Sequence, residues 1–243
     1  LSWHLFSNLF YGSQLRVKVN ISMLLAVLLL VSVVDISIAE KDLGTGTDSL
    51  LGGDLTDPED DGKPEQDKNY NAKFTSNDEP GFGGGEFAFN VFDNVLGPSN
   101  DKWCCGKGGG AKEGMWVTAE FDKKYALTHF TVSSANDVPA RDPLVWEVQG
   151  SNDGKKFTTI YSHDEKKPIW TQRLQVIRFD AGKDFKKQTV GYKFFRHITT
   201  ETQSWPNGAY FQIGEIEYFG DTNFPVDPKS KLTSSWGRIK SNR

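Results

Sequence analysis

The chain of 243 residues has few of the residue types on which several protein classes depend. It holds two cysteines, too few for a disulfide-rich scaffold, and four histidines, which leave little material for a histidine-based metal site. Its formal net charge of −4 gives no sign of the clustered basic face that nucleic-acid binding requires. The two methionines and the absence of any amphipathic run of three helical turns argue against a helical bundle.

A transmembrane helix is not expected either, because the apolar run at residues 23–34 is short. It contains 12 residues, whereas a membrane-spanning helix needs about 20. The small residues Ser37 and Ala39 follow at the −3 and −1 positions of a cleavage site, which is typical of a secretory signal peptide. We therefore interpret residues 23–39 as a signal peptide, with a buried apolar strand or a membrane anchor as the alternative.

The signal peptide interpretation fixes two further expectations. Met23 is the first methionine, so we expect synthesis to begin there and residues 1–22 to be translated upstream sequence. We also expect the protein to be secreted and extracellular.

The segment at residues 40–80 is strongly acidic, with 12 acidic and 4 basic residues. It has few aromatic residues, many Gly, Asp and Pro, and no sustained hydrophobic period. Such a segment does not bury enough apolar surface to offset about 1–2 kcal/mol of backbone entropy per residue. The composition predicts a disordered leader that acts as a flexible acidic linker. The acidic cluster at residues 57–61 suggests attraction to calcium or a mineral surface, but a solvated linker is the plainer interpretation.

From about Gly81 the pattern becomes that of an all-β domain. Strand-length runs with alternation or β-branched enrichment occur at residues 116–121, 130–132, 144–149, 157–161, 174–179, 192–198 and 210–219. Turn signals separate them at residues 122–123, 150–154, 181–182 and 206–208. Because no helices alternate with these runs, they predict an antiparallel β-sandwich or jelly roll at residues 81–220. A polar tail follows at residues 221–243.

Four stretches of this domain resemble a known family. The stretches are Phe92-Asp93-Asn94 with Lys102-Trp103, residues 134–143 (SANDVPARDP), residues 146–154 (WEVQGSNDG) and residues 214–217 (GEIE). In their order and spacing they resemble a discoidin domain, also called a coagulation factor V/VIII (F5/8) type C domain. The resemblance covers about 135 residues and implies a galactose-binding-like β-sandwich, the fold of many carbohydrate-binding modules. It specifies the ligand poorly, because this fold hosts many unrelated partners.

Some residues of these stretches have ordinary structural interpretations. Trp103 and Trp146 lie in or beside strand-like runs, and we expect both to pack in the core. Arg141 is suited to a bidentate bond with a carboxylate that would lock the loop at residues 134–143.

The resemblance also implies a structural calcium ion. In the family, calcium often lies where an early loop meets the last strand, and its ligands include an Asp and a Glu. Here Asp93 and Glu215 match those two positions, and Gly214 would offer a carbonyl oxygen, in keeping with the oxygen ligands that calcium takes. The loop departs from the family pattern by an extra stretch at residues 96–100 and by Asp101, which stands where a threonine is usual. Asp101 is therefore either an additional ligand or a sign that the insertion abolished the site.

The sequence leaves the state of the adjacent Cys104 and Cys105 open. A strained vicinal disulfide, intermolecular bridges and free thiols are the three alternatives in a secreted chain.

The sequence favours binding over catalysis. The histidines are separated and no nucleophile motif accompanies them, so we expect a protein that is not an enzyme. Sugar-binding sandwiches place aromatic side chains and hydrogen-bonding groups in loops at one end of the scaffold. The candidates here are Trp170, Trp205, Asn207 and Tyr210.

The sequence therefore predicts a secreted, calcium-stabilised module that binds glycans or glycoproteins, with no nucleic-acid partner and no membrane span. A structural protein of an extracellular matrix, such as a mineralised skeletal or shell matrix, is the alternative, favoured by the acidic segment. An accessory piece of a glycosidase is a third hypothesis.

Overall fold

The computed structural model describes residues 41–63, 66, 68–78, 85–105, 113–204 and 210–224. The predicted signal peptide, Trp205, Asn207 and most of the predicted tail lie outside the described residues. The strands are β1 (Lys41–Thr45), β2 (Ala72–Ser76), β3 (Trp103–Cys104), β4 (Met115–Ser133), β5 (Pro143–Ser151), β6 (Thr158–His163), β7 (Gln175–Asp180), β8 (Tyr192–Thr202), β9 (Gln212–Ile213) and β10 (Ile216–Asp221). Three short 3₁₀ helices are η1 (Thr47–Ser49), η3 (Ala88–Phe92) and η4 (Pro139–Arg141). Within this part of the chain, no helix has the length and apolarity needed to cross a bilayer.

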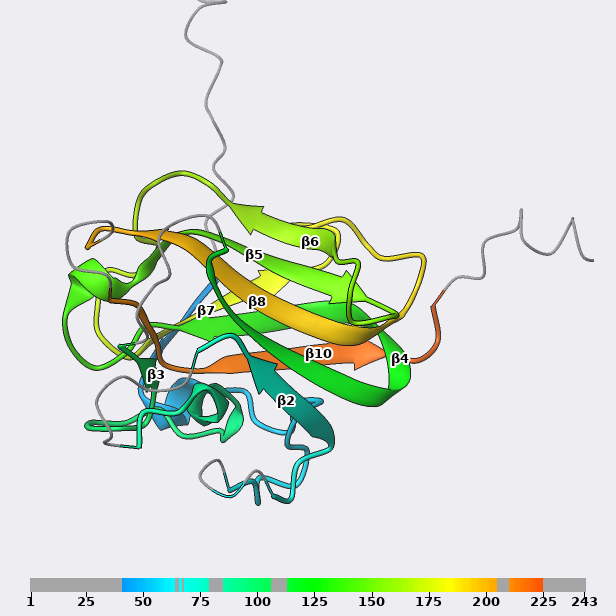
Figure 1. The fold of residues 1–243 in the computed structure, drawn as a ribbon, viewed down its shortest axis with the longest axis horizontal. Helices are drawn as coiled ribbons and strands as arrows, with labels where there is room; N and C mark the ends of the chain where they lie inside the picture. The colour runs from blue at the N-terminus through cyan, green and yellow to red at the C-terminus, as the bar shows by residue number, and fades with distance from the viewer. Residues whose placement is uncertain are drawn as a thin grey trace, which may run out of the picture. The chain divides into compact units, whose positions relative to one another are not determined.

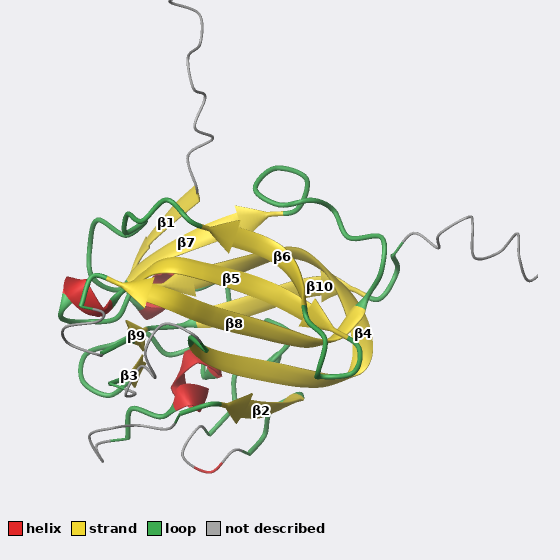
Figure 2. Cartoon of the chain, turned by 45° about the horizontal axis from the view of Figure 1, so that its top comes forward, coloured by secondary structure: helices red, strands yellow, loops and turns green. Residues whose placement is uncertain are grey.

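The strands form two antiparallel layers that share the long strand β4 (Figures 1 and 2). The first half of β4 pairs with β2 and β8, and β5 and β6 continue that layer in the order β2-β4-β8-β5-β6. The second half pairs with β7 and β10, and β1 joins β7 at the edge of the other layer. The expected antiparallel β-sandwich is confirmed.

The turn predicted at residues 122–123 is wrong, because β4 runs through these residues without a break. Its register against β8 shifts between Glu120 and Tyr125, where the strand passes from one layer to the other. The polar residues at this point therefore mark a change of layer within one strand.

Aromatic side chains fill the space between the layers. Trp146 is fully buried, and its ring lies 5.1 Å from that of Tyr161, 5.3 Å from His197 and 5.5 Å from Phe179, measured between centroids. Trp103 is also fully buried, as the sequence predicts for both tryptophans.

The prediction of a flexible linker at residues 40–80 is wrong for the described part of that segment. β1 pairs with β7, and β2 pairs with β4 in the register Phe74↔Ala119. Phe74 is 6% exposed and stacks on Phe92, with ring centroids 4.6 Å apart. The composition led to a wrong prediction because an edge strand pairs its backbone N–H and C=O groups with a neighbouring strand of the sheet. Such a strand needs few apolar side chains of its own.

The run at residues 210–219, predicted as one strand, is divided into β9 and β10. β9 pairs with β3 in a separate two-stranded sheet, whereas β10 pairs with β4. Gly214 and Glu215 lie at the break between the two strands, where the backbone leaves one sheet and enters the other.

Candidate functional site

Adjacent cysteines form a vicinal disulfide where β3 ends. Cys104 and Cys105 are bonded to each other and are 0% and 3% exposed. Cys105 has a φ of 70° and donates its N–H to the carbonyl of Phe211 at 2.8 Å. The structure thus selects the vicinal bridge from the three alternatives that the sequence left open.

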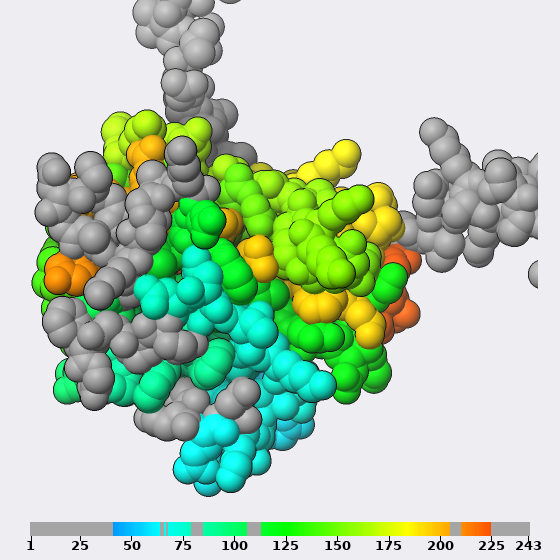
Figure 3. Space-filling view, viewed as in Figure 1, coloured from blue at the N-terminus to red at the C-terminus, as the bar shows by residue number. Residues whose placement is uncertain are grey.

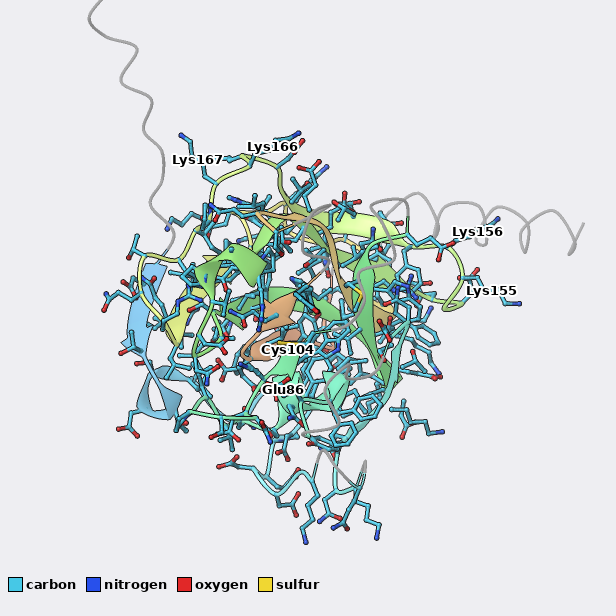
Figure 4. The ribbon with its side chains drawn as sticks, turned by 60° about the vertical axis from the view of Figure 1, so that its left-hand side comes forward. Glu86, Cys104, Lys155, Lys156, Lys166 and Lys167 are labelled. Carbon is cyan, nitrogen blue, oxygen red and sulfur yellow. A yellow bond between two sulfur atoms is a disulfide. The ribbon has the colours of Figure 1, made fainter. Side chains whose placement is uncertain are left out.

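The disulfide lies close to a carboxylate (Figure 4). The Glu86 carboxylate and the sulfurs of Cys104 and Cys105 are within 4.8 Å of one another. The thiolate is the form of cysteine that binds metals, and two sulfurs bonded to each other are not thiolates. This cluster is therefore not a metal site in the disulfide state.

Arg141 connects the disulfide to an exposed aromatic ring. Its Nη1 lies 3.7 Å from the Cys104 sulfur and 3.5 Å from the Cys105 sulfur. Its guanidinium carbon is 5.1 Å from the ring centroid of Tyr210, which is 37% exposed. Arg141 makes no ion pair with any carboxylate in the described part of the chain.

The carboxylate lock predicted for Arg141 is instead made by Arg173. Arg173 forms a bidentate pair with the buried Asp142 and also donates to the carbonyl of Asp137 at 2.9 Å. Gln212 donates to the same carboxylate at 3.2 Å. Burial raises the pKa of Asp142, and the bonds from Arg173 oppose that rise. This network fixes the loop around η4 and leaves Arg141 at its surface.

The buried Lys102 also holds this loop, through an ion pair with the exposed Asp137. Lys102 is 2% exposed, and its ammonium lies 3.0 Å from the Asp137 carboxylate and 3.5 Å from the Glu86 carboxylate. It also donates to the side-chain oxygen Oδ1 of Asn136 at 2.7 Å. The charged side chains Lys102 and Arg173 thus both form ion pairs that hold this loop in place.

Trp170, proposed from the sequence as a sugar-stacking residue, is buried. It is 4% exposed, belongs to the hydrophobic core and donates its indole N–H to the carbonyl of Val132 at 3.3 Å. It packs against the scaffold, so its face is not available to a ligand, and that assignment is wrong. Of the four predicted ligand residues, Tyr210 is exposed, and Trp205 and Asn207 lie outside the described residues.

An acidic cluster, formed by Asp54, Asp93, Glu215 and Glu217, lies where η3 meets the last strand. Glu215 is fully buried, and its Oε1 accepts the N–H of Asn94 at 3.2 Å. Burial raises the pKa of Glu215 well above its usual value, and the charges of Asp93, Glu217 and Asp54 raise it further. Burial and the neighbouring charges therefore disfavour the ionised form of Glu215 in the absence of a cation.

Two oxygen atoms at this cluster have no hydrogen-bond partner among the described residues. They are Oε2 of Glu215 and the side-chain oxygen Oδ1 of Asn94, both buried. Asn94 has a φ of 56° and donates its amide to the carbonyl of Asp57 at 3.2 Å, which orients the side chain. A buried oxygen without a partner is costly, and a hard cation with oxygen ligands would satisfy it. These donors therefore fit the calcium ion that the sequence led us to expect.

The other predicted ligands have different surroundings. Asp101 has its carboxylate beside Gly97, where an added Cβ would lie 2.6 Å from its Oδ2. Gly214 has no room for a side chain, because a Cβ would lie 2.5 Å from Cδ1 of Leu96 and 2.7 Å from the carbonyl of Ser134. A packing requirement thus accounts for glycine at this position, and it brings the inserted loop against the end of β9.

Sequence reasoning missed that the acidic segment at residues 40–80 contributes to the acidic cluster. Asp54 is 2% exposed and accepts N–H bonds from Tyr218 at 2.9 Å and Asp57 at 3.0 Å. Burial is the largest cause raising the pKa of Asp54 to about 7. The pattern Asp54-Leu55-Thr56-Asp57 carried a local signal for a side-chain-capped turn, but nothing in it indicated β10 as the partner.

The family model for the F5/8 type C domain matches residues 71–212, which is more than half of the chain. The chain belongs to the F5/8 type C domain family. The match begins inside the predicted linker, and β1 and β10 lie outside it. The matched region includes Asp93 of the acidic cluster. It also includes Cys104, Arg141 and Tyr210 around the disulfide.

Similar proteins include an enzyme and several carbohydrate-binding modules. A peptide-N(4)-(N-acetyl-β-glucosaminyl)asparagine amidase of Arabidopsis thaliana is 28% identical over 114 residues, which are 45% of this chain and 15% of that protein. The chain therefore spans about 15% of the length of this relative.

Among solved structures, the module CpGH89CBM32-5 of Clostridium perfringens, in complex with GalNAc-β-1,3-galactose, is 18% identical, with a TM-score of 0.46, over 62% of this chain and 96% of that one. The CBM32-1, CBM32-2 and M60 catalytic domains of Clostridium perfringens ZmpB are 16% identical, with a TM-score of 0.47, over 69% of this chain and 15% of that one. At such identities the likeness concerns the fold alone.

Proposed function

We propose that this F5/8 type C domain is a secreted, non-catalytic module that binds glycans or glycoconjugates and is stabilised by calcium. The observation that carries the proposal is the pair formed by Arg141 and Tyr210 at the end of the sandwich. Tyr210 offers an exposed ring, and Arg141 lies over it without a carboxylate partner in the described residues. An exposed aromatic ring beside an arginine that has no carboxylate partner among the described residues suits a sugar, which presents an apolar ring face and several hydroxyl acceptors.

The scaffold around this pair supports a preorganised binding surface. The disulfide lies against the guanidinium, and the Arg173–Asp142 pair holds the loop that carries it. Fixing these groups before the ligand arrives lowers the entropy cost of binding. The same commitments support a non-catalytic role, because the buried Lys102 and Asp142 are held in structural pairs rather than poised for proton transfer.

We further propose that Glu215, Asp93 and Asn94 hold calcium in the acidic cluster. The ion would supply positive charge, and the buried oxygens that lack hydrogen-bond partners in the described residues would coordinate it. Its role there is structural, since the acidic cluster joins the end of η3 to the strand break between β9 and β10.

The matrix alternative rests on a free acidic tether, and the structure weakens that premise. Asp54 and Asp57 are 2% and 0% exposed and form part of the folded domain. They are therefore not available to bind mineral or a basic matrix partner.

Secretion is tested by sequencing the N-terminus of the protein recovered from the medium of expressing cells. Cleavage after Ala39 predicts a mature chain that starts at Glu40. Recovery of a chain that keeps residues before Glu40 would contradict the signal peptide interpretation.

Glycan binding is tested on a broad glycan array with the wild-type domain, Y210A and R141Q. We expect binding to a defined set of glycans, reduced about tenfold or more in both variants because ring stacking and a multiple hydrogen bond are lost. R178Q is the matched control, because Arg178 loses the same charge on β7, where it is paired with Asp180. No binding across the array, or equal binding by the wild type and both variants, would overturn the proposal.

A further inference from the structure

A second arginine is held between two aromatic rings on the outer face of the β2-β4-β8-β5-β6 layer. Arg196 lies on β8, Trp116 lies on β4, and Phe157 follows the turn between β5 and β6. The guanidinium carbon is 3.9 Å from the Trp116 ring centroid and 3.8 Å from the Phe157 ring centroid. Figure 3 shows yellow-green residues of the β5–β6 turn over gold residues of β8 on the face toward the viewer.

The sandwich leaves only the edge of the guanidinium for hydrogen bonding. Both faces lie against rings, and Nε donates to the hydroxyl of Thr118 at 2.8 Å. The terminal nitrogens make no ion pair or hydrogen bond with any described residue. Burial lowers the pKa of Arg196, but arginine stays charged at every ordinary pH. The result is a rigid cation whose in-plane donors remain to be satisfied.

The acidic groups nearby do not neutralise this cation. Glu147 lies on β5 two residues from Gln149, which pairs in register with Arg196. Its carboxylate accepts bonds from Gln149 at 2.7 Å and Thr159 at 2.8 Å. Glu120 is exposed on β4 and pairs in register with Phe194, which lies two residues from Arg196 on β8.

Two lysines add positive charge beside Phe157. The carboxylate of Asp153 accepts the backbone N–H groups of Lys155 and Lys156 at 2.9 and 2.8 Å, which shapes the turn. The side chains of both lysines are exposed and project from the turn (Figure 4). The turn therefore places basic charge at the rim of the Arg196 sandwich, which favours an anionic partner.

We propose that the outer face around Arg196 is a second binding site that takes the carboxylate of an acidic sugar residue, such as a uronic acid within a glycan chain. A planar carboxylate matches the planar fork of a guanidinium in two parallel hydrogen bonds. The rings hold that fork in one orientation, so little side-chain entropy is lost on binding. This site lies on the middle of β8, whereas the Arg141–Tyr210 pair lies in the loops, so the proposal stands apart from the proposed function.

The test uses the wild-type domain and a four-residue oligomer of galacturonic acid at low salt. Binding is followed by titration calorimetry and by the NMR signal of the Arg196 Nε–H group. We expect the oligomer to shift that signal and to bind about tenfold more tightly to the wild type than to R196Q, because a charge-assisted bidentate bond is lost. R196K is expected to bind as weakly as R196Q, because lysine keeps the charge but lacks the fork.

The controls separate this site from general charge attraction and from the loop end. R178Q removes the same charge elsewhere and is expected to bind the acidic oligomer as the wild type does, and Y210A likewise. The methyl ester of the oligomer is expected not to shift the Arg196 signal.

Equal binding by the wild type and R196Q, or equal binding of the acid and its ester, would overturn the proposal. If R196Q does not fold, as judged by its thermal melt, the comparison of acid and ester on the wild-type Arg196 signal decides the question, and an unmoved signal overturns it.

Discussion

Replacing Glu215 by glutamine should change the stability of the domain in opposite directions with and without calcium. One oxygen of this buried carboxylate has no hydrogen-bond partner in the described residues, and burial first, then the charges of three neighbouring acids, raise its pKa. Without a cation, ionised Glu215 is repelled by these neighbours, so the neutral glutamine should make the chelated protein more stable than the wild type. With calcium the order should reverse, because glutamine removes one negative ligand.

The size of the calcium effect follows from linkage. An ion present at a hundred times its dissociation constant stabilises the folded state by about 2.7 kcal/mol. For a domain of this size, about 1 kcal/mol shifts the melting temperature by about 2–4 °C. We therefore expect calcium to raise the melting temperature of the wild type by about 5–10 °C, and that of E215Q by much less.

The assay is calorimetry at pH 7 in EDTA and in millimolar calcium chloride. E120Q is the control, since Glu120 is exposed on β4 and should leave the calcium response unchanged. A wild-type melting temperature that ignores calcium, or an E215Q variant that keeps the full calcium response, would refute the reasoning.

Three further predictions concern stability. His197 is fully buried, neither ring nitrogen has a partner in the described residues, and burial lowers its pKa to about 3. Below pH 6.5 His197 binds a proton in the unfolded chain but stays neutral in the folded chain, so the free energy of unfolding should fall as the pH drops from 6.5 toward 3. In equilibrium unfolding experiments, H197L should lose this contribution to the pH dependence of the unfolding free energy. W170A should lose about 3–5 kcal/mol of unfolding free energy in urea while its folded fraction keeps the glycan affinity, and a loss of affinity would restore Trp170 as a ligand residue. G214A should lose about 1–3 kcal/mol, because its Cβ would lie 2.7 Å from the Ser134 carbonyl, and an unchanged unfolding midpoint would contradict that packing.

The sequence predicts the sandwich well because alternation is a local signal. The runs at residues 144–149 and 174–179 lie within β5 or overlap β7 almost completely, and the turn at residues 150–154 connects β5 to β6. β1 and β2 were missed because their stability comes from pairing with β7 and β4, which are distant in sequence. Local composition holds no record of such a partner.

The site was predictable only in part, for a similar reason. The resemblance led to Asp93 and Glu215, and the structure brings them together with Asn94, which no pattern in the sequence indicated as a ligand. Trp170 shows the limit most clearly, because a tryptophan in a polar loop can stack on a ligand or pack into the core. Only the position of the loop relative to β4 decides between these outcomes.

NMR mapping of the domain with the tightest-binding glycan from the array tests the central claim most directly. Binding at the loop end predicts that the largest shifts fall on the side-chain signals of Arg141 and Tyr210 and on the backbone around the disulfide. Shifts confined to other surfaces, with these signals unmoved at saturation, would contradict a glycan site at this end of the sandwich.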